Sequence, residues 1–580
     1  MSEATIQRAA GPIAVGDWLG RSLALLVALA LLLKLHLLFV LNVNWDEFHY
    51  LSKVYSYLRG ELTRPLQTVH VHFFTWLRHV SENEVDQVIA ARLVIYGFSL
   101  GSAWLFYRIG RCFLDSTATL FALLCYFALS YVVEHGTSFR FDPIAVFFCL
   151  GAVCLLLCAR PAWLGALVAG LALAAALMVT IKSVLYLPVL GCLLLLPVLR
   201  SEDRRRGLVN AALFALALAG GFALLYAAHR ASLQPVELHR SADFAVRAAD
   251  KVFRLDDLFP RWPFFVVSLI ESGVVWICLV LGIVTLVRRA RAAVPEDCAT
   301  AIPLLIFLLP LISLLIYRNA FPYFYVFIMP LPLLACGAFF AAIVRSSPGR
   351  VIRSPRLLAA GLVLAVTVSL GKVYLASAEP ALAQQRQTIA LAHRLFPEPV
   401  AYIGRTEMVA SYRKVGFFMS TWGMENYLER GEPIFRELLV RERPLFLIAN
   451  IASLDPRMPP ERLRALGGYA LLDEDHAVLA ANYVHHWGAL YVAGKRLALP
   501  REGDALSFEI LIPGVYTLEA KAPVTIDGRL VEPGKSLRLD PGLHRAEIDA
   551  NGPAKAILRW GEGLHRPAEP APEGPLFTGF

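Results

Sequence analysis

Residues 22–50 read SLALLVALALLLKLHLLFVLNVNWDEFHY, an apolar run that ends in a short charged and aromatic segment. The run over residues 22–43 is long enough to cross a bilayer, because a membrane-spanning helix needs about 20 apolar residues. No small-residue cleavage site follows it, so it is typical of a first membrane helix and not of a removed signal peptide. The sequence therefore predicts that Asp46 and Glu47 lie where this helix leaves the membrane.

The composition of the whole chain indicates a multi-pass membrane protein. Of its 580 residues, 57% are hydrophobic and 17% are charged, whereas an ordinary soluble domain is about 45–50% apolar and about 25% charged. This surplus excludes a disordered chain, a fibrous repeat and a purely cytosolic enzyme. The location of the positive charges matters more in such a protein than their net value of +9, so we expect no nucleic-acid partner. The nine cysteines include no CxxC pair, and neither a zinc site nor a disulfide framework is indicated.

About eleven membrane helices can be placed on the sequence. Their predicted spans are 22–43, 88–107, 117–133, 143–159, 162–180, 184–199, 207–228, 263–287, 301–317, 321–344 and 357–377. The loops between them alternate between short arginine-rich segments and two long segments of mixed charge, 44–87 and 229–262. By the positive-inside rule the arginine-rich loops are cytoplasmic. The predicted protein lies in the plasma membrane (the bacterial inner membrane), with its N-terminus inside and everything after about residue 378 outside.

Three regions follow from this pattern. Residues 1–378 form the predicted transmembrane domain. Residues 379–489 mix helical periodicity with short apolar runs, which favours an extracytoplasmic α/β region. Residues 490–580 alternate apolar and polar residues between turn signals such as Asp527-Gly528, which predicts a β-sandwich-like module with a Pro-rich tail. This last module is either a stabilising appendage or a carbohydrate-binding unit.

The first long loop carries the most specific local signal. If a helix starts after the first span, Asp46 and Tyr50 share one of its faces, whereas Asp46 and Glu47 are about 100° apart. The alternative is that Asn44 or Asp46 only caps this helix. Further along the loop, His70 and His72 share a face only if the segment is extended. A divalent metal is a candidate cofactor here, although two histidines alone do not make a site.

Other predicted outside turns contribute further charged and aromatic groups. Asp142 precedes Pro143 and could instead be a simple helix N-cap. Lys182 could bind a phosphate or could only snorkel from a helix end. The remaining candidates are Arg240 and Arg318 for the phosphate, and Tyr50, His70, His72 and Tyr323 for the substrate.

These groups gather at one predicted membrane surface, with acids to accept a proton, cations to hold an anion and aromatic rings to bind rings. Such a set suits the transfer of a sugar from a membrane-anchored phosphate. A carboxylate would remove the proton of an acceptor hydroxyl, and fixed cations would stabilise the departing polyprenyl phosphate. The expected partners are a polyprenyl-phosphate sugar, membrane lipids and a lipid, glycan or protein acceptor.

The stretch DEFHYLSKVYSYLRGELTRPLQTVHVHFFTWL, residues 46–77, carries a resemblance to a known family. With its topology, the sequence resembles the C-type integral-membrane glycosyltransferases (GT-C), especially bacterial relatives of the lipid A aminoarabinose transferase and the protein O-mannosyltransferases, over roughly residues 20–375. The resemblance implies that Asp46 is the catalytic base, supported by Glu47. It also implies that Asp142 shapes the site and that Lys182 contacts the lipid phosphate. The sequence departs from the family at residues 69–72, where a Lys-Pro-Pro-like segment is usual.

Two alternative functions compete with this interpretation. One is an oligosaccharide transferase or ligase that uses a diphosphate-linked glycan. The other is a non-catalytic transporter of lipid-linked sugars, which predicts charged residues along the middle of the membrane. Catalysis predicts instead that the acids lie together at one interface.

Overall fold

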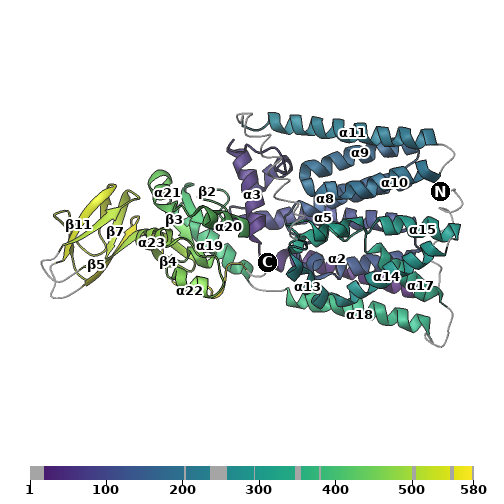
Figure 1. The fold of residues 1–580 in the computed structure, drawn as a ribbon. Helices are drawn as coiled ribbons and strands as arrows, with labels where there is room; N and C mark the ends of the chain where they lie inside the picture. Colours follow the sequence, from purple (N-terminus) through teal and green to yellow (C-terminus); the bar gives the residue numbers. More distant parts are fainter. Residues whose placement is uncertain are drawn as a thin grey trace. The chain divides into compact units, whose positions relative to one another are not determined.

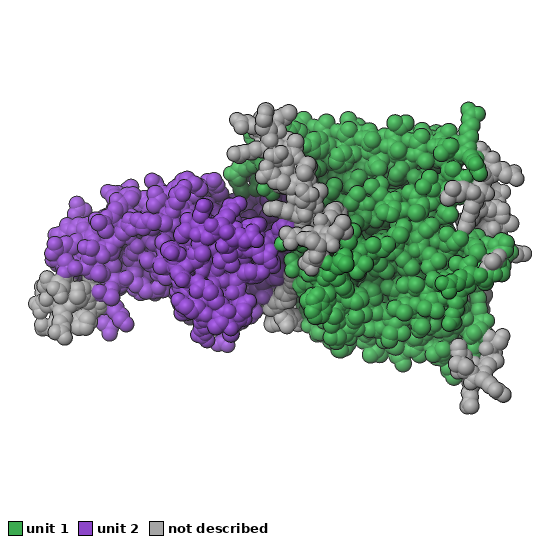
Figure 2. All heavy atoms as spheres, in the orientation of Figure 1, with its two compact units in different colours: residues 1–41, 56–77, 89–379 green, residues 42–55, 78–88, 380–580 purple. Residues whose placement is uncertain are grey.

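The computed structural model describes residues 18–200, 204–234, 258–292, 294–346, 354–377, 381–499, 505–548 and 554–577. The chain divides into two compact units, coloured green and purple in Figure 2. Unit 1 comprises residues 1–41, 56–77 and 89–379, and unit 2 comprises residues 42–55, 78–88 and 380–580. Two pieces of the first long loop therefore belong with the C-terminal region.

Unit 1 is a helical membrane domain (Figure 1). Among the described residues, eight helical stretches are long and apolar enough to cross a membrane. They are α2 (Trp18–Val40), α5 (Glu84–Gly110, whose first turn belongs to unit 2), α9 (Ala162–Val179), α10 (Leu187–Arg200) with the preceding 3-10 turn (Ile181–Tyr186), α11 (Arg204–Ala231), α14 (Gly273–Arg291), α15 (Pro295–Ile306) with the following 3-10 turn (Leu309–Leu315), and α18 (Pro355–Ala376). Shorter helices are α4 (Val71–Phe74), α6 (Ser116–Phe127), α7 (Ser130–His135), α8 (Asp142–Cys158), α13 (Trp262–Glu271), α16 (Pro322–Ile328) and α17 (Leu334–Arg345). The predicted class, a multi-pass α-helical membrane protein with a C-terminal sheet region, is confirmed.

Small residues allow these helices to pack closely. Helix α9 packs against both α8 and α11, and α14 packs against α17. A side chain at Gly170 of α9 would lie 2.4 Å from the carbonyl oxygen of Phe214, and one at Gly282 of α14 would lie 2.2 Å from that of Ala335. Because lipid is as apolar as leucine, membrane helices associate through such close backbone contact and not through hydrophobic burial.

The structure interrupts four spans that the sequence predicts as continuous. The stretch 117–133 is divided into α6 and α7. The stretch 263–287 is divided into α13 and α14 at Ser272, whose hydroxyl accepts a hydrogen bond from the backbone amide of Ser130 at 2.8 Å. The stretch 321–344 is divided into α16 and α17 around Pro330 and Pro332, and 301–317 is divided near Pro310. Proline lacks a backbone N–H and clashes with the preceding turn. A hydropathy window sums apolar character and does not detect such breaks.

Unit 2 contains most of α3 (Trp45–Leu58) and an α/β region followed by strands. Its helices are α19 (Ala381–Leu395), α20 (Thr421–Arg430), α21 (Phe435–Glu442), α22 (Pro460–Ala465) and α23 (Asp473–Asn482). Its strands are β1 (Ala401–Gly404), β2 (Arg413–Val415), β3 (Phe446–Ile448), β4 (Tyr483–Trp487), β5 (Leu490–Leu499), β6 (Leu506–Ile510), β7 (Gly514–Glu519), β8 (Val524–Ile526), β9 (Arg529–Val531), β10 (Ser536–Leu539), β11 (Gly542–Ile548) and β12 (Ala554–Trp560).

The strands form two sheets. The larger has the order β10-β7-β12-β5-β3-β1-β2, with β4 paired to β5, and the smaller has the order β6-β11-β8-β9. Strand β1 is parallel to both β2 and β3, whereas β5 is antiparallel to β3. The sheet is thus continuous across residue 490, because β5 pairs with strands on both sides of that position.

The hairpin between β8 and β9 has the turn that its sequence predicts. Asp527 and Gly528 both have positive φ, 48° and 77°. Two such residues in succession give a two-residue turn whose twist matches that of the strands it joins.

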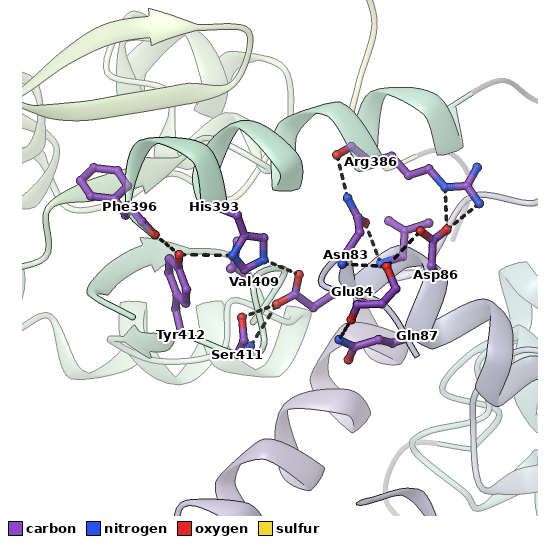
Figure 3. Close-up of polar contacts among 12 residues, drawn as sticks. Asn83, Glu84, Asp86, Gln87, Arg386, His393, Phe396, Val409, Ser411 and Tyr412 are labelled. Carbon is purple, nitrogen blue, oxygen red and sulfur yellow. Dashed lines mark hydrogen bonds and ion pairs between the residues drawn. The ribbon is translucent and has the colours of Figure 1, made fainter. Parts of the chain in front are cut away.

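A buried polar network holds residues 78–88 to the rest of unit 2 (Figure 3). Glu84 is fully buried, and its carboxylate accepts hydrogen bonds from the amide and hydroxyl of Ser411 at 3.1 and 2.5 Å. It also lies 3.0 Å from Nε2 of His393. The hydroxyl of Tyr412 donates to the carbonyl of Phe396, so it accepts from Nδ1 of His393, 3.2 Å away. Both ring nitrogens of His393 therefore donate, which is the pattern of a protonated imidazole.

The charge state of His393 follows from these contacts. Burial alone lowers its pKa, but the hydrogen bond and the negative charge of Glu84 outweigh burial and raise the pKa above the usual value. A second ion pair, between Asp86 and Arg386 at 2.8 Å, joins the same two segments.

We predict that this network makes the stability of unit 2 depend on pH. A histidine whose pKa is raised by folding stabilises fully below its unfolded pKa of about 6.5, and this contribution is lost as the pH rises through the folded pKa. His393→Gln should therefore lower the thermal unfolding midpoint more at pH 6 than at pH 8.5. An equal loss at both pH values would show that the imidazole is not charged in the folded protein.

Candidate functional site

The first turn of α3 is built by a reciprocal cap. The side-chain oxygen of Asn44 accepts from the amide of Asp46 at 3.0 Å, and the carboxylate of Glu47 accepts from the amide of Asn44 at 2.9 Å. This is capping-box geometry, in which two otherwise unpaired amides at a helix start are satisfied. Asn44 is therefore the cap, and Glu47, which is fully buried, contributes to the helix start. The carboxylate of Asp46 is not required for the cap.

A second set of contacts binds this turn to residues 405–407. The hydroxyl of Thr406 donates to the carbonyl of Trp45 at 2.9 Å. The guanidinium of Arg405 lies 3.9 Å from the centre of the Trp45 ring. Burial lowers the pKa of Arg405 to about 10, while the negative charge of Asp46 acts in the opposite direction. Arg405 and Asp46 are thus electrostatic neighbours within unit 2.

The next turn of α3 is fixed by a contact between His49 and Glu407. His49 lies 3.0 Å from the carboxylate of Glu407, and its ring is stacked on Phe418 with 4.6 Å between ring centres and 8° between planes. Burial raises the pKa of Glu407, but the charges of His49, Lys414 and Lys53 hold it well below its usual range. The candidate Tyr50 lies beside His49, with 6.0 Å between the two ring centres.

The topology of the sheet explains where residues 405–407 lie. Residues 405–407 directly follow β1, between two parallel strands, and the amide of Arg405 donates to the side chain of Asn450, which follows β3, at 2.7 Å. Ligands of open α/β sheets bind at the carboxyl ends of the strands. Sequence reasoning missed Arg405 and Glu407. The sequence does contain a signal for both residues, because two charged side chains follow the apolar run 400–403.

Unit 1 contains a separate buried cluster around Asp142, the first residue of α8. Lys182 lies 2.5 Å from one carboxylate oxygen of Asp142, and Arg140 lies 3.3 Å from the other. Both cations lie over the ring of Tyr323, the Arg140 guanidinium carbon at 3.4 Å and the Lys182 nitrogen at 4.7 Å from its centre. Three candidates from three different loops, Asp142, Lys182 and Tyr323, are thus brought together. Arg140 completes the group.

The cluster brings two buried cations to one carboxylate among the described residues. The side chains of Asp142, Arg140 and Lys182 are only 4%, 3% and 12% exposed. Buried charges interact strongly because they are poorly screened by solvent. Asp142 is engaged by cations and is more than a helix cap. The arrangement can hold an anion such as a phosphate.

The histidine candidates take different partners. The segment Val71–Phe74 is helical, so His70 and His72 do not share a face. His70 is buried against Phe141, with 3.9 Å between ring centres. His72 lies 2.8 Å from His229, whose other ring nitrogen lies 2.8 Å from the hydroxyl of Thr68.

The structure adds little about the predicted divalent metal and about the phosphate-binding candidates Arg318 and Arg240. In the described ranges no group of three or more His, Cys, Asp or Glu residues could hold a metal ion, and the divalent metal stays a prediction. Arg318 accepts through its backbone oxygen from Arg261 at 3.2 Å. Arg240 lies outside the described residues.

Comparison with known proteins identifies the fold. No protein-family model matches this sequence, and no curated protein sequence matches it significantly. Among solved structures, the chain is similar to the oligosaccharyltransferase of Archaeoglobus fulgidus in the apo form, with a TM-score of 0.54 and 11% identity over 91% of this chain and 76% of that one. It is also similar to ArnT from Cupriavidus metallidurans bound to undecaprenyl phosphate, with a TM-score of 0.50 and 15% identity over 77% of this chain and 94% of that one.

A third solved structure agrees with these two. The archaeal oligosaccharyltransferase AglB from Archaeoglobus fulgidus, in complex with an inhibitory peptide and a dolichol-phosphate, has a TM-score of 0.50 and 10% identity, over 95% of this chain and 98% of that one. The chain has the GT-C fold of membrane glycosyltransferases. The resemblance inferred from the sequence is confirmed at the level of the fold.

We predict that Glu47 has a structural role that an amide can fill. Glu47→Gln keeps an acceptor for the Asn44 amide and should leave both thermal stability and activity nearly unchanged. Glu47→Ala should lower the free energy of unfolding by about 1–3 kcal/mol, because it leaves a shielded donor without a partner. Thermal unfolding and transfer assays on both variants test this. A Gln variant that is stable but inactive would show that Glu47 takes part in the reaction.

Proposed function

We propose that this protein transfers a sugar from a polyprenyl-phosphate donor to an acceptor hydroxyl at the outer face of the plasma membrane. The observation that carries the proposal is the buried cluster in which Lys182 and Arg140 both contact Asp142, in a chain of GT-C fold. Two of the similar structures contain a lipid-linked phosphate, undecaprenyl phosphate in ArnT and dolichol-phosphate in AglB. This supports glycosyl transfer from a lipid carrier, with residues 1–378 as the catalytic membrane domain.

The donor phosphate is the proposed ligand of Lys182 and Arg140. As the bond between the anomeric carbon and the phosphate oxygen breaks, negative charge grows on the phosphate. Cations that are already in place stabilise this charge without rearranging during the reaction. Asp142 keeps both cations oriented, and the Tyr323 ring offers them a favourable negative face.

Asp46 is the proposed general base. It accepts the proton of the acceptor hydroxyl while that oxygen forms its bond to the anomeric carbon and polyprenyl phosphate leaves. The cap by Asn44 and the contacts of Trp45 and His49 hold its helix turn in place. Tyr50 lies one turn further along α3 and is a candidate for substrate contact.

Most acids of unit 1 lie away from the middle of the predicted spans, whereas Glu271 falls inside the predicted span 263–287 and Lys34 is buried within α2. Each described acidic residue of unit 1 lies in a loop or within one turn of a helix end: Glu61, Asp115, Glu134, Asp142, Glu271, Glu296 and Asp297. A transporter of charged lipid-linked sugars is expected to place ionisable groups near the middle of the membrane. The arginine-rich loops and the positive-inside rule support an extracytoplasmic C-terminal region.

The overall test is a donor panel. Purified protein is incubated with radiolabelled polyprenyl-phosphate sugars, or with a diphosphate-linked glycan, and membrane extract, and the labelled product is identified. Transfer from a monophosphate donor is the expected result. Transfer only from the diphosphate-linked glycan, or from no donor, would contradict the proposal.

Lys182 provides a direct test of the phosphate site. Lys182→Ala should weaken donor binding by roughly 10- to 150-fold, since a charged hydrogen bond is worth about 1.5–3 kcal/mol. Lys182→Arg keeps the charge and should lose less. The control is Lys372→Ala, which removes an exposed lysine of α18. Equal donor dissociation constants for wild type and Lys182→Ala would remove Lys182 from the donor site.

Asp46→Asn tests the base. The substitution keeps the shape of the side chain and should leave folding intact, because Asn44 makes the cap. Single-turnover transfer should fall by about 10²–10⁴-fold, which is the usual contribution of general acid–base catalysis, while donor affinity changes little. Asp473→Asn is a matched control, because Asp473 also begins a helix of unit 2 but pairs with Arg464 at the surface. A fully active Asp46→Asn protein would exclude Asp46 as the base.

A further inference from the structure

Arg405 is an electrostatic neighbour of Asp46 but has no role in the proposed reaction. Its guanidinium carbon lies over the Trp45 ring, and its Nε is shielded from solvent without a hydrogen-bond partner among the described residues. Arginine is always charged and has five N–H donors. Leaving a shielded donor of such a group unpaired is costly. The side chain is therefore held ready for an acceptor that the described residues do not provide.

The charges around Arg405 favour an anion as that acceptor. On α3, Asp46, His49 and Lys53 are spaced so that they share one helix face. From the segment after β1, Glu407 and Lys414 face the same region, because the charges of His49, Lys414 and Lys53 all act on Glu407.

Three cations (Arg405, Lys53 and Lys414) lie in the region of two carboxylates (Asp46 and Glu407). The amino group of Lys414 donates to the carbonyls of Gly416 and Phe417 at 3.3 and 2.7 Å. Among these cations, Arg405 is thus the one with a shielded and unused donor beside Asp46.

We propose that Arg405 binds an anionic group, a phosphate or a carboxylate, on the acceptor molecule. This rests on the proposed function, in which Asp46 takes the proton of the acceptor hydroxyl. A cation beside that base faces the acceptor, whereas the donor phosphate has its own cations, Lys182 and Arg140, in unit 1. The contact with the Trp45 ring restrains the guanidinium, and a planar fork of donors matches a phosphate or carboxylate. The protein thereby selects acidic acceptors over neutral ones.

A binding experiment tests the anion site without turnover. Methyl phosphate is added to the full-length protein in the Lys182→Gln background, which weakens the donor site, and the rise in thermal unfolding midpoint gives the dissociation constant. Arg405→Gln should weaken binding tenfold or more, and Arg405→Lys should weaken it less. Arg538→Gln removes an exposed arginine of β10 and should have no effect. Unchanged binding to Arg405→Gln would overturn the proposal.

A kinetic experiment assigns the anion to the acceptor. With one active donor and membrane extract as acceptor, methyl phosphate should compete with the extract in wild type, and Arg405→Gln should raise the acceptor KM about tenfold with little change in the donor KM. A raised donor KM with an unchanged acceptor KM would overturn the assignment. A wild type that transfers from no donor contradicts the proposed function instead, and the binding experiment still decides whether Arg405 holds an anion.

Discussion

The contacts between α3 and the segment after β1 are the constraint on which the candidate site of unit 2 depends. A helix of 14 residues that follows a membrane span has little reason to keep one orientation by itself. Here the contact of His49 with Glu407, the stacking of His49 on Phe418 and the hydrogen bond of Thr406 to Trp45 fix successive turns of this helix. The carboxylate of Asp46 therefore lies in a defined environment, which includes the guanidinium of Arg405.

The carboxylates of Asp142 and Glu407 are surrounded by different sets of basic groups. Around Asp142, two buried cations contact the two oxygens of one carboxylate. Around Glu407, burial alone would favour the protonated acid, but three neighbouring basic groups keep it ionised. Removing one member of such a buried group leaves an uncompensated charge, which is far more costly than the modest net gain from the intact group.

The sequence predicts the membrane character, the positions of most spans and the hairpin turn at Asp527-Gly528, because these depend on local composition and on the conformational freedom of glycine. It does not predict the break at Ser272, which involves a tertiary partner, the amide of Ser130. The break near Pro330 and Pro332 is marked by the prolines, but a hydropathy window does not detect it. Asp142, Lys182 and Tyr323 can be named as candidates because polar residues at helix ends are conspicuous in an apolar chain. Their mutual contact cannot be predicted, because it requires three segments that are far apart in the sequence to come together. Arg405 was missed for the same reason, because its partner Trp45 lies near the other end of the chain.

The ion pair of Lys182 with Asp142 has a consequence for affinity. A free lysine side chain has many rotamers, and fixing them costs about 1.5–2 kcal/mol. Because Asp142 already fixes Lys182, this entropy is lost when the protein folds and not when a ligand arrives. An anion that enters the cluster meets a preorganised partner, so a larger share of its interaction energy appears as affinity.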